Sequence, residues 1–226
     1  MATMDLQLKE GVHVLTLTNG EDDNRFTLDV INEYIAAIDE VAKYEGNTAL
    51  MITCEHEKTW TTGINLDWMM QLDADGIENF RITLDTMLYK LAMLNAPTLA
   101  CINGNAYAGG ALLFAAADFT YMRSDRGRLC YPEIDIRIPF TPAMNDLIDN
   151  IPNKQMLKRM ALLGERVTGQ DALDAGIVDA VYPMAELQEK SFEFAKFLAS
   201  KDRPTYTTIK HGLKRHMLKW EEEYGK

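Results

Sequence analysis

The sequence has few cysteines, few histidines and no run of basic residues. None of its cysteines forms a CxxC pair, and all lie in or beside apolar segments, so we expect reduced core residues and an intracellular protein. The histidines are too dispersed to bind a metal, and none neighbours a serine or cysteine that would act as a nucleophile, so we expect no metal site. The net charge of −11, without a lysine- or arginine-rich face, argues against nucleic acid as a partner. The cysteines are Cys54, Cys101 and Cys130, and the histidines are His13, His56, His211 and His216.

Long hydrophobic runs are also missing. No apolar segment reaches the roughly 18 residues of a membrane span, so we expect no membrane association. The first residues lack the apolar stretch of a signal peptide, and the last residues do not form a peroxisomal tripeptide, so we expect a cytoplasmic protein. What the chain does contain is 226 residues that are 47% hydrophobic and 25% charged, a composition typical of one globular unit with a sizeable core.

The spacing of apolar residues predicts an α/β core followed by helices. Thr27 is a plausible N-cap for an amphipathic helix that runs to about residue 42. We expect the core to occupy residues 1–140 and a helical region to occupy residues 141–226. The predicted strands are 6–9, 13–17, 49–54, 97–102, 119–122 and 128–130, and the other predicted helices are 75–94, 109–117, 142–149, 154–163, 170–175, 184–200 and 204–224.

Small residues fill the turn between the strand that ends at Ile102 and the next helix. Gly109 and Gly110 allow a ligand to approach the backbone closely, and the N–H groups of a helix N-terminus favour a negatively charged oxygen. The alternative is that these small residues only let the helix pack tightly against its strand.

A second loop of this kind follows the strand at residues 49–54. It contains Thr61, Gly63 and Ile64. Because both loops follow predicted neighbouring strands, we expect them to open at the same edge of a sheet. Two backbone N–H groups that converge on one oxygen form an oxyanion hole.

Taken in order along the chain, these motifs resemble the crotonase, or enoyl-CoA hydratase/isomerase, superfamily. The resemblance implies a ββα spiral fold, assembly into trimers or dimers of trimers, and binding of an acyl-CoA thioester. Coenzyme A is then part of the substrate, and no separate cofactor is implied. The amides of Ile64 and Gly109 are the implied oxyanion hole. The matching segments are residues 24–26, 60–66, 102–112, 118, 132–140 and 169–179.

The carboxylates that the resemblance implies distinguish two reactions, hydration and double-bond isomerisation. Family hydratases place one glutamate three residues beyond the central glycine of the turn, where this chain has Leu112, and a second in a later Pro-Glu segment, where it has Glu133. A double-bond isomerase works with one carboxylate in an apolar pocket. The chain therefore looks most like a 3,2-trans-enoyl-CoA isomerase, with Glu133 moving a proton from the α to the γ carbon. The alternative for Glu133 is a solvated carboxylate that follows Pro132.

Two residues depart from the family pattern. Asn65 stands where aspartate is common, and Arg137 stands where glycine is usual. Arg137 could lie over the pocket, pair with Glu133 or Asp135, or recognise a polar acyl group. Pairing with Glu133 would lower the pKa of that carboxyl and weaken it as a base.

Several further residues are candidates for substrate contacts. We expect Thr61, Gly63, Gly110 and Leu112 to lie beside the substrate. Arg25 is either a ligand of the CoA phosphates or a solvated loop arginine. Trp68 either lines an acyl tunnel or belongs to the core. Lys210, Lys214 and Arg215 either contact CoA or form a solvent-exposed face, and we favour the exposed face.

Two other functions remain open at this stage. The first is another reaction of the same fold, namely hydrolysis, decarboxylation or hydration of a CoA thioester. The second is a non-catalytic acyl-CoA-binding subunit, suggested by Leu112 and Arg137.

Overall fold

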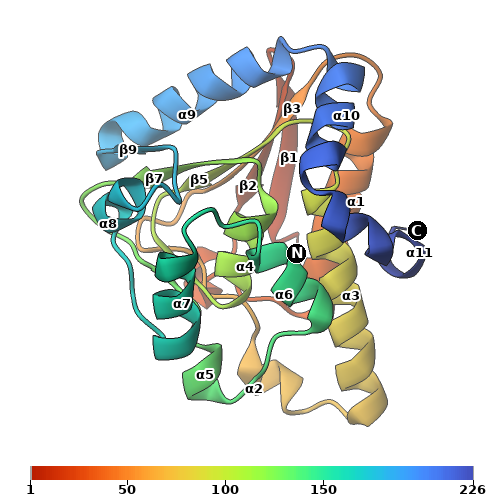
Figure 1. Cartoon of the computed structure of the whole chain (residues 1–226), viewed down its shortest axis with the longest axis vertical. Coiled ribbons are helices and arrows are strands. Elements are labelled where there is room, and N and C mark those ends of the chain that lie inside the picture. The colour runs from red at the N-terminus through yellow and green to blue at the C-terminus, as the bar shows by residue number, and fades with distance from the viewer. Residues whose placement is uncertain (1, 226) are drawn as a thin grey trace.

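A computed structural model describes residues 2–225 as two β-sheets surrounded by helices (Figure 1). The strands are β1 (Met4–Lys9), β2 (Val12–Leu17), β3 (Ala49–Cys54), β4 (Thr59–Thr61), β5 (Thr98–Ile102), β6 (Asn105–Tyr107), β7 (Phe119–Arg123), β8 (Leu129–Cys130) and β9 (Ala180–Tyr182). The helices are η1 (Gly20–Asp22), α1 (Leu28–Lys43), α2 (Leu66–Met69), α3 (Ala74–Ala92), α4 (Gly109–Ala116), α5 (Glu133–Ile136), α6 (Pro142–Ile148), α7 (Lys154–Leu163), α8 (Gly169–Asp174), α9 (Met184–Ala199), α10 (Arg203–Leu213), η2 (Arg215–Trp220) and α11 (Glu221–Tyr224). The predicted α/β core with helices at the C-terminus is confirmed.

The larger sheet has the strand order β1-β2-β3-β5-β7-β9. The first two strands, which correspond to the predicted strands 6–9 and 13–17, form an antiparallel hairpin, and every later pair is parallel. Helices cover both faces, so the central strands are apolar without alternation. On β3, Leu50 and Ile52 belong to the main core, whereas Ala49 and Met51 face the smaller cluster under α9. Figure 1 shows α9 on one side of the sheet and α1 and α3 on the other.

Capping side chains open the two long helices of the main core. The Thr27 hydroxyl accepts a hydrogen bond from the Val30 amide, which confirms Thr27 as the N-cap of α1. The Asp73 side chain accepts from the Gly76 amide at 2.8 Å and opens α3. These contacts satisfy N–H groups that a helix start leaves without partners.

The last predicted helix is wrong as a single element. The chain from Arg203 onward forms α10, η2 and α11. The break follows Lys214, the C-cap of α10, whose carbonyl accepts from Met217 at 2.8 Å. After the turn, Met217 and Tyr224 are both buried in the main core.

Within residues 2–225, no helix is long and apolar enough to cross a membrane. All three cysteines are buried and unbridged, as expected for core residues.

Candidate active site

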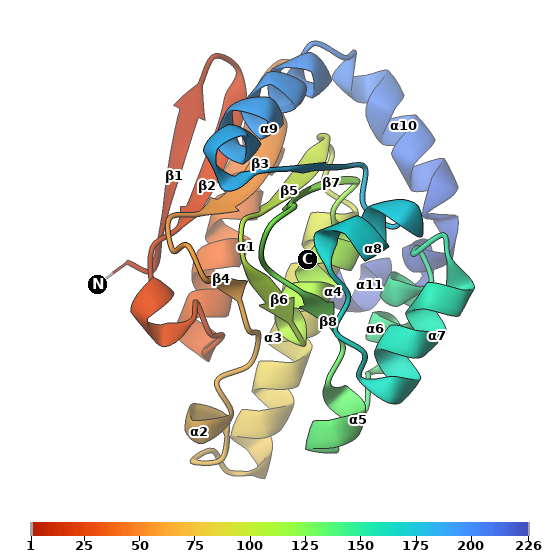
Figure 2. The ribbon, with the colours of Figure 1, turned by 90° about the vertical axis from the view of Figure 1, so that its left-hand side faces the viewer.

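Three short parallel strands bring the predicted site segments to one edge. The smaller sheet has the order β4-β6-β8, and all of its pairs are parallel. Gly63 follows β4, Gly109 follows β6 and Glu133 follows β8. Because the carboxyl ends of parallel strands meet at one edge, the three segments leave the sheet on the same side. Figure 2 shows this sheet beside α4, with α5 leading away from β8. The expectation of a shared edge is met through β4 and β6, two strands that the sequence did not predict.

The two glycine turns are in direct contact. Gly63 has a positive φ of +76°, and a Cβ added there would lie 2.3 Å from the Gly109 amide nitrogen. A Cβ on Gly110 would lie 2.3 Å from the carbonyl oxygen of Thr61, and one on Gly109 would lie 2.6 Å from the ring of Phe26. Gly63 and Gly110 are therefore required because the two backbones touch, and Gly109 is required because the Phe26 ring lies against it.

Two amide groups at this contact have no acceptor in the described part of the chain. Phe26 donates to the Gly63 carbonyl at 2.7 Å and accepts from Asn65 at 2.9 Å. These two bonds use the carbonyl of Gly63 and the amide of Asn65, the residues on either side of Ile64. The N–H of Ile64 itself is left without an acceptor in the described part of the chain. The Gly109 N–H starts α4, where the first helical bond runs from Leu112 to Ala108 at 3.0 Å, so it is unpaired as well.

Thr61 holds the first of these turns together. Its hydroxyl donates to the Asn24 carbonyl at 2.8 Å and accepts from the Gly63 amide at 3.1 Å. The side chain is fully buried. Thr61 thus fixes the backbone that carries Gly63.

Glu133 is a buried carboxylate at the first position of α5. The residue is 9% exposed, and its Oε2 atom is buried without a hydrogen-bond partner. Burial raises the pKa of Glu133 to about 7, because the apolar surroundings disfavour the charged form. The alternative, a solvated carboxylate after Pro132, is therefore wrong. A carboxyl with a pKa near neutrality can both take up and return a proton.

The residue that replaces a second glutamate is part of the core. Leu112 lies on α4, is 2% exposed and belongs to the main apolar cluster. Trp68 on α2 is partly buried against the same cluster, with its ring centroid 5.3 Å from that of Phe80.

The two departures from the family pattern have local roles. Asn65 is the N-cap of α2 and accepts from the Trp68 amide at 3.1 Å. Arg137 ends α5 with φ 60° and ψ 35°, a left-handed conformation that glycine adopts more readily. Arg137 is exposed and makes no ion pair with any residue between 2 and 225, so no pairing with Glu133 or Asp135 is found.

Arg25 is held by acidic side chains. It forms an ion pair with Asp22, and its Nη1 atom lies 3.4 Å from Oδ2 of Asp67. About a third of the Arg25 side chain is exposed, at 31%. A phosphate at this arginine would have to compete with both carboxylates.

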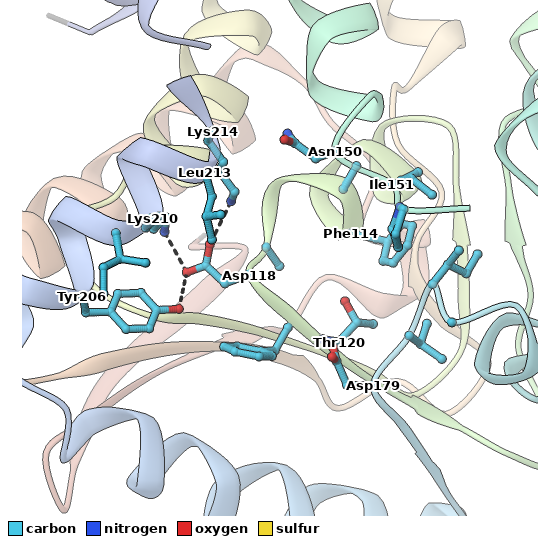
Figure 3. A pocket seen from close by; sticks show the side chains of 18 residues that line it. Phe114, Asp118, Thr120, Asn150, Ile151, Asp179, Tyr206, Lys210, Leu213 and Lys214 are labelled. Carbon is cyan, nitrogen blue, oxygen red and sulfur yellow. Dashed lines mark hydrogen bonds and ion pairs between the residues drawn. The ribbon is translucent and has the colours of Figure 1, made fainter. Parts of the chain in front are cut away.

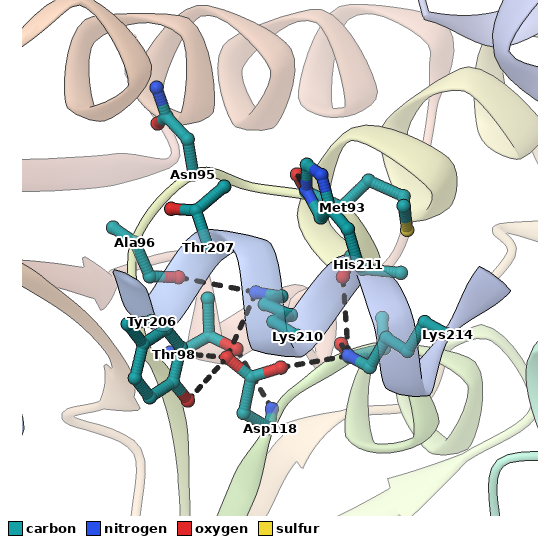
Figure 4. A network of polar contacts seen from close by, with 12 residues as sticks. Met93, Asn95, Ala96, Thr98, Asp118, Tyr206, Thr207, Lys210, His211 and Lys214 are labelled. Carbon is teal, nitrogen blue, oxygen red and sulfur yellow. Dashed lines mark hydrogen bonds and ion pairs between the residues drawn. The ribbon is translucent and has the colours of Figure 1, made fainter. Parts of the chain in front are cut away.

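The two lysines expected on an exposed face are instead buried. Lys210 and Lys214 each place Nζ 2.8 Å from a carboxylate oxygen of Asp118, which lies just beyond α4 (Figure 4). Lys214 also donates to the carbonyls of Ala92 and Ala116, at the C-terminal ends of α3 and α4. The expected exposed face is therefore wrong for both lysines, because α10 packs against these helix ends. Of the three basic residues, only Arg215 is exposed.

A cavity of about 540 Å³ adjoins this buried charge cluster. Figure 3 shows Asp118, Lys210 and Tyr206 on one side and Asn150 and Ile151 on the other. The cavity lies at the C-terminal end of α4, whereas the unpaired Gly109 amide lies at its N-terminal end. Among residues 2–225, no group of three or more histidine, cysteine or acidic side chains is placed to hold a metal ion.

Sequence patterns assigned no role to Tyr131 or to Asn24. Tyr131 donates to the Ala111 carbonyl on α4, and Asn24 donates to the Trp60 carbonyl. Both bonds join segments far apart in sequence, so no local spacing signals them.

Comparison with known proteins identifies relatives of the chain. Residues 7–224 match the enoyl-CoA hydratase/isomerase family. The chain is 30% identical over 216 residues to enoyl-CoA delta isomerase 3 of Arabidopsis thaliana, covering 92% of this chain and 90% of that protein. It is 24% identical to a short-chain-enoyl-CoA hydratase of Clostridium acetobutylicum, covering 92% of this chain and 80% of that protein. An enoyl-CoA hydratase structure from Bacillus anthracis has the same fold, with a TM-score of 0.83 at 19% identity and coverage of 98% and 89%.

Proposed function

The chain belongs to the enoyl-CoA hydratase/isomerase family, and on that basis we propose that it is a double-bond isomerase that converts 3-enoyl-CoA to 2-trans-enoyl-CoA. The observation that carries the proposal is the carboxylate count: Glu133 is buried with a pKa of about 7, while the position of a second glutamate is the core residue Leu112. Two positioned carboxylates suit the activation of water. A single carboxylate in an apolar site suits a proton shuttle.

In the proposed mechanism the thioester oxygen accepts hydrogen bonds from the amides of Ile64 and Gly109. Ionised Glu133 removes a proton from the α carbon, and the electron pair of that C–H bond delocalises onto the thioester oxygen as an enolate. The enolate binds the two amides more tightly than the neutral carbonyl does, which lowers the barrier. One such donor typically contributes about 2.7–4 kcal/mol.

The second step returns the same proton to the γ carbon. Protonated Glu133 donates it, the enolate collapses, and the double bond moves from the β–γ to the α–β position. Glu133 ends ionised as it began, so no oxidant, water or cofactor is consumed. Coenzyme A enters and leaves as part of the thioester.

The proposal is tested with 3-hexenoyl-CoA and purified protein, following the conjugated 2-enoyl thioester. We expect turnover by the wild type and a loss of at least 100-fold in Glu133→Gln, because general acid–base groups typically supply 10²–10⁴-fold. An inactive wild type, or a Glu133→Gln variant with undiminished turnover, would contradict the proposal. The same samples are examined for 3-hydroxyhexanoyl-CoA and free CoA, which report hydration and hydrolysis.

We also propose a trimer or a dimer of trimers. Ile209 and Leu213, beside the cavity at the end of α4, are 58% and 77% exposed, which supports a covered apolar surface in an assembly. Light scattering coupled to gel filtration is the test, and a species of 25.6 kDa would contradict this assembly.

A further inference from the structure

Tyr131 links the segment that carries Glu133 to the helix that begins at Gly109. Its side chain is fully buried between β8 and α5, and its hydroxyl donates to the carbonyl of Ala111 at 2.9 Å. Ala111 is the second residue after Gly109, and Tyr131 is the second residue before Glu133. One hydrogen bond therefore connects the two segments that the proposed reaction needs in register.

The chemistry of the Tyr131 hydroxyl suits a permanent link. Burial raises the pKa of Tyr131 well above its usual value, so the group stays protonated and donates at any working pH. A carbonyl oxygen has two lone pairs, so Ala111 can accept this bond in addition to a helical one. The ring is fixed by Phe140, which packs edge-on with centroids 5.6 Å apart.

The other hydrogen bonds at Glu133 are local to α5: its carbonyl accepts from Arg137 and from Ile138, the latter at 3.1 Å. Its buried Oε2 atom has no partner within residues 2–225, so that oxygen does not anchor the carboxylate. The strand before it, β8, has two residues, and α5 has four. The last backbone hydrogen bond between β8 and the segment that leads into α4 is donated by the Ala108 amide to the Cys130 carbonyl at 3.1 Å. The next hydrogen bond along the chain is the one that the Tyr131 hydroxyl donates to Ala111.

We propose that Tyr131 is a positioning residue that holds Glu133 in register with the amide of Gly109. This inference rests on the proposed isomerase function. Misplacement of a catalytic group by about 1 Å can cost about 10²-fold in rate. Loss of one hydrogen bond with the ring retained is a smaller perturbation, so we expect Tyr131→Phe to lower kcat about tenfold and to leave KM within about twofold.

Tyr34→Phe is the matched control. Tyr34 is also fully buried, but its hydroxyl has no partner in the described chain. Removing that hydroxyl deletes no hydrogen bond and should leave kcat unchanged. Both variants are measured with 3-hexenoyl-CoA for kcat and KM separately.

Amide hydrogen exchange provides a readout that does not depend on turnover. In Tyr131→Phe we expect faster exchange in peptides covering residues 129–137 and unchanged exchange in β3. In Tyr34→Phe we expect no change in residues 129–137. A loss of kcat accompanied by faster exchange throughout β3 would indicate general destabilisation and would overturn the positioning role.

The outcomes separate this inference from the proposed function. An active wild type whose Tyr131→Phe variant keeps its kcat, or shows wild-type exchange over residues 129–137, overturns the role of Tyr131 alone. An inactive wild type overturns the proposed isomerase function, and the positioning role of Tyr131 in that reaction is then overturned as well. A selective fall in kcat together with local exchange supports both.

Discussion

Gly63 approaches Gly109 so closely that Gly63 cannot carry a side chain. A Cβ on Gly63 would lie 2.3 Å from the Gly109 amide nitrogen, whereas a Cβ on Gly109 would meet the Phe26 ring at 2.6 Å and the Cα of Gly63 at 3.1 Å. This contact joins the end of the β4 turn to the first residue of α4. It sets the separation of the two amides that we propose as the oxyanion hole.

Gly63→Ala should therefore be severely damaging. The added methyl group meets backbone atoms, which cannot move aside as a flexible side chain would, and φ is +76°. We expect a loss of more than about 3 kcal/mol in unfolding free energy and at least 100-fold in kcat, measured by urea denaturation and the isomerase assay.

Gly11→Ala is the control for the backbone angle alone. Gly11 has φ +82°, and a Cβ there has no heavy atom within 4 Å. Its cost should be about 1–2 kcal/mol, without loss of kcat. Equal effects of the two alanines would contradict a role for the contact between Gly63 and Gly109.

The activity should depend on the ionisation of Glu133. Only the ionised carboxylate removes the α proton, and burial raises the pKa of Glu133 to about 7. We expect kcat/KM to fall tenfold per pH unit below about pH 7 and to level off above it. A profile that levels off already at about pH 4.5 would show that the base does not have the raised pKa assigned to Glu133.

The same ionisation of Glu133 that raises activity with pH should lower the stability of the folded protein. Its pKa is raised in the folded state, so the folded protein binds this proton more tightly than the unfolded chain does, and stability is lost as pH rises from about 4.5 to about 7. Glu133→Gln removes the buried charge and should stabilise the protein by up to about 3 kcal/mol at pH 8 and very little at pH 4.

Urea denaturation at a series of pH values measures this effect. Glu189→Gln, at an exposed site on α9, is the control and should show no such pH-dependent gain. A Glu133→Gln variant that is less stable than the wild type at pH 8 would refute the prediction.

Asp118 should be essential for folding. It lies between Lys210 and Lys214, whose side chains are 3% and 11% exposed. Asp118→Asn leaves two buried lysines without a counter-charge, and breaking such a buried pair costs about 3–5 kcal/mol.

Glu193→Gln provides the comparison because it removes an exposed ion pair, with Lys190 at 3.1 Å. It should cost less than about 1 kcal/mol. Thermal and urea denaturation of both variants test the difference, and a small effect of Asp118→Asn would show that the buried cluster is not needed for stability.

Leu112→Glu should change the product distribution. It introduces a carboxyl on the third residue after Gly109, at the position that family hydratases use. We expect a lower isomerisation rate and the appearance of 3-hydroxyhexanoyl-CoA, measured by chromatography of the products. Leu112→Met conserves the apolar volume and should yield no hydration product. A folded Leu112→Glu variant without hydration would count against Leu112 as the residue that separates the two reactions.

Local features were predictable wherever neighbouring residues decide them. Thr27 caps α1 because its hydroxyl reaches an amide three residues ahead, and the glycines after β6 mark a tight turn in any context. The long C-terminal helix was predicted wrongly because helical spacing continues past Lys214, whereas the backbone there changes to the 3-10 turn of η2, which the spacing does not signal. Lys210 was placed in solvent because nothing near it in sequence signals Asp118.

Which chemical groups the protein carries can be read from the chain alone: one carboxylate at Glu133, a leucine at 112, and two glycine-containing turns after strands. What those groups experience depends on the fold. The raised pKa of Glu133 depends on desolvation by segments that are distant in the chain. The contact of Gly63 with Gly109 and the link from Tyr131 to Ala111 depend on the parallel arrangement of β4, β6 and β8. Residue identity is a local property, whereas burial and proximity arise from packing across the whole fold.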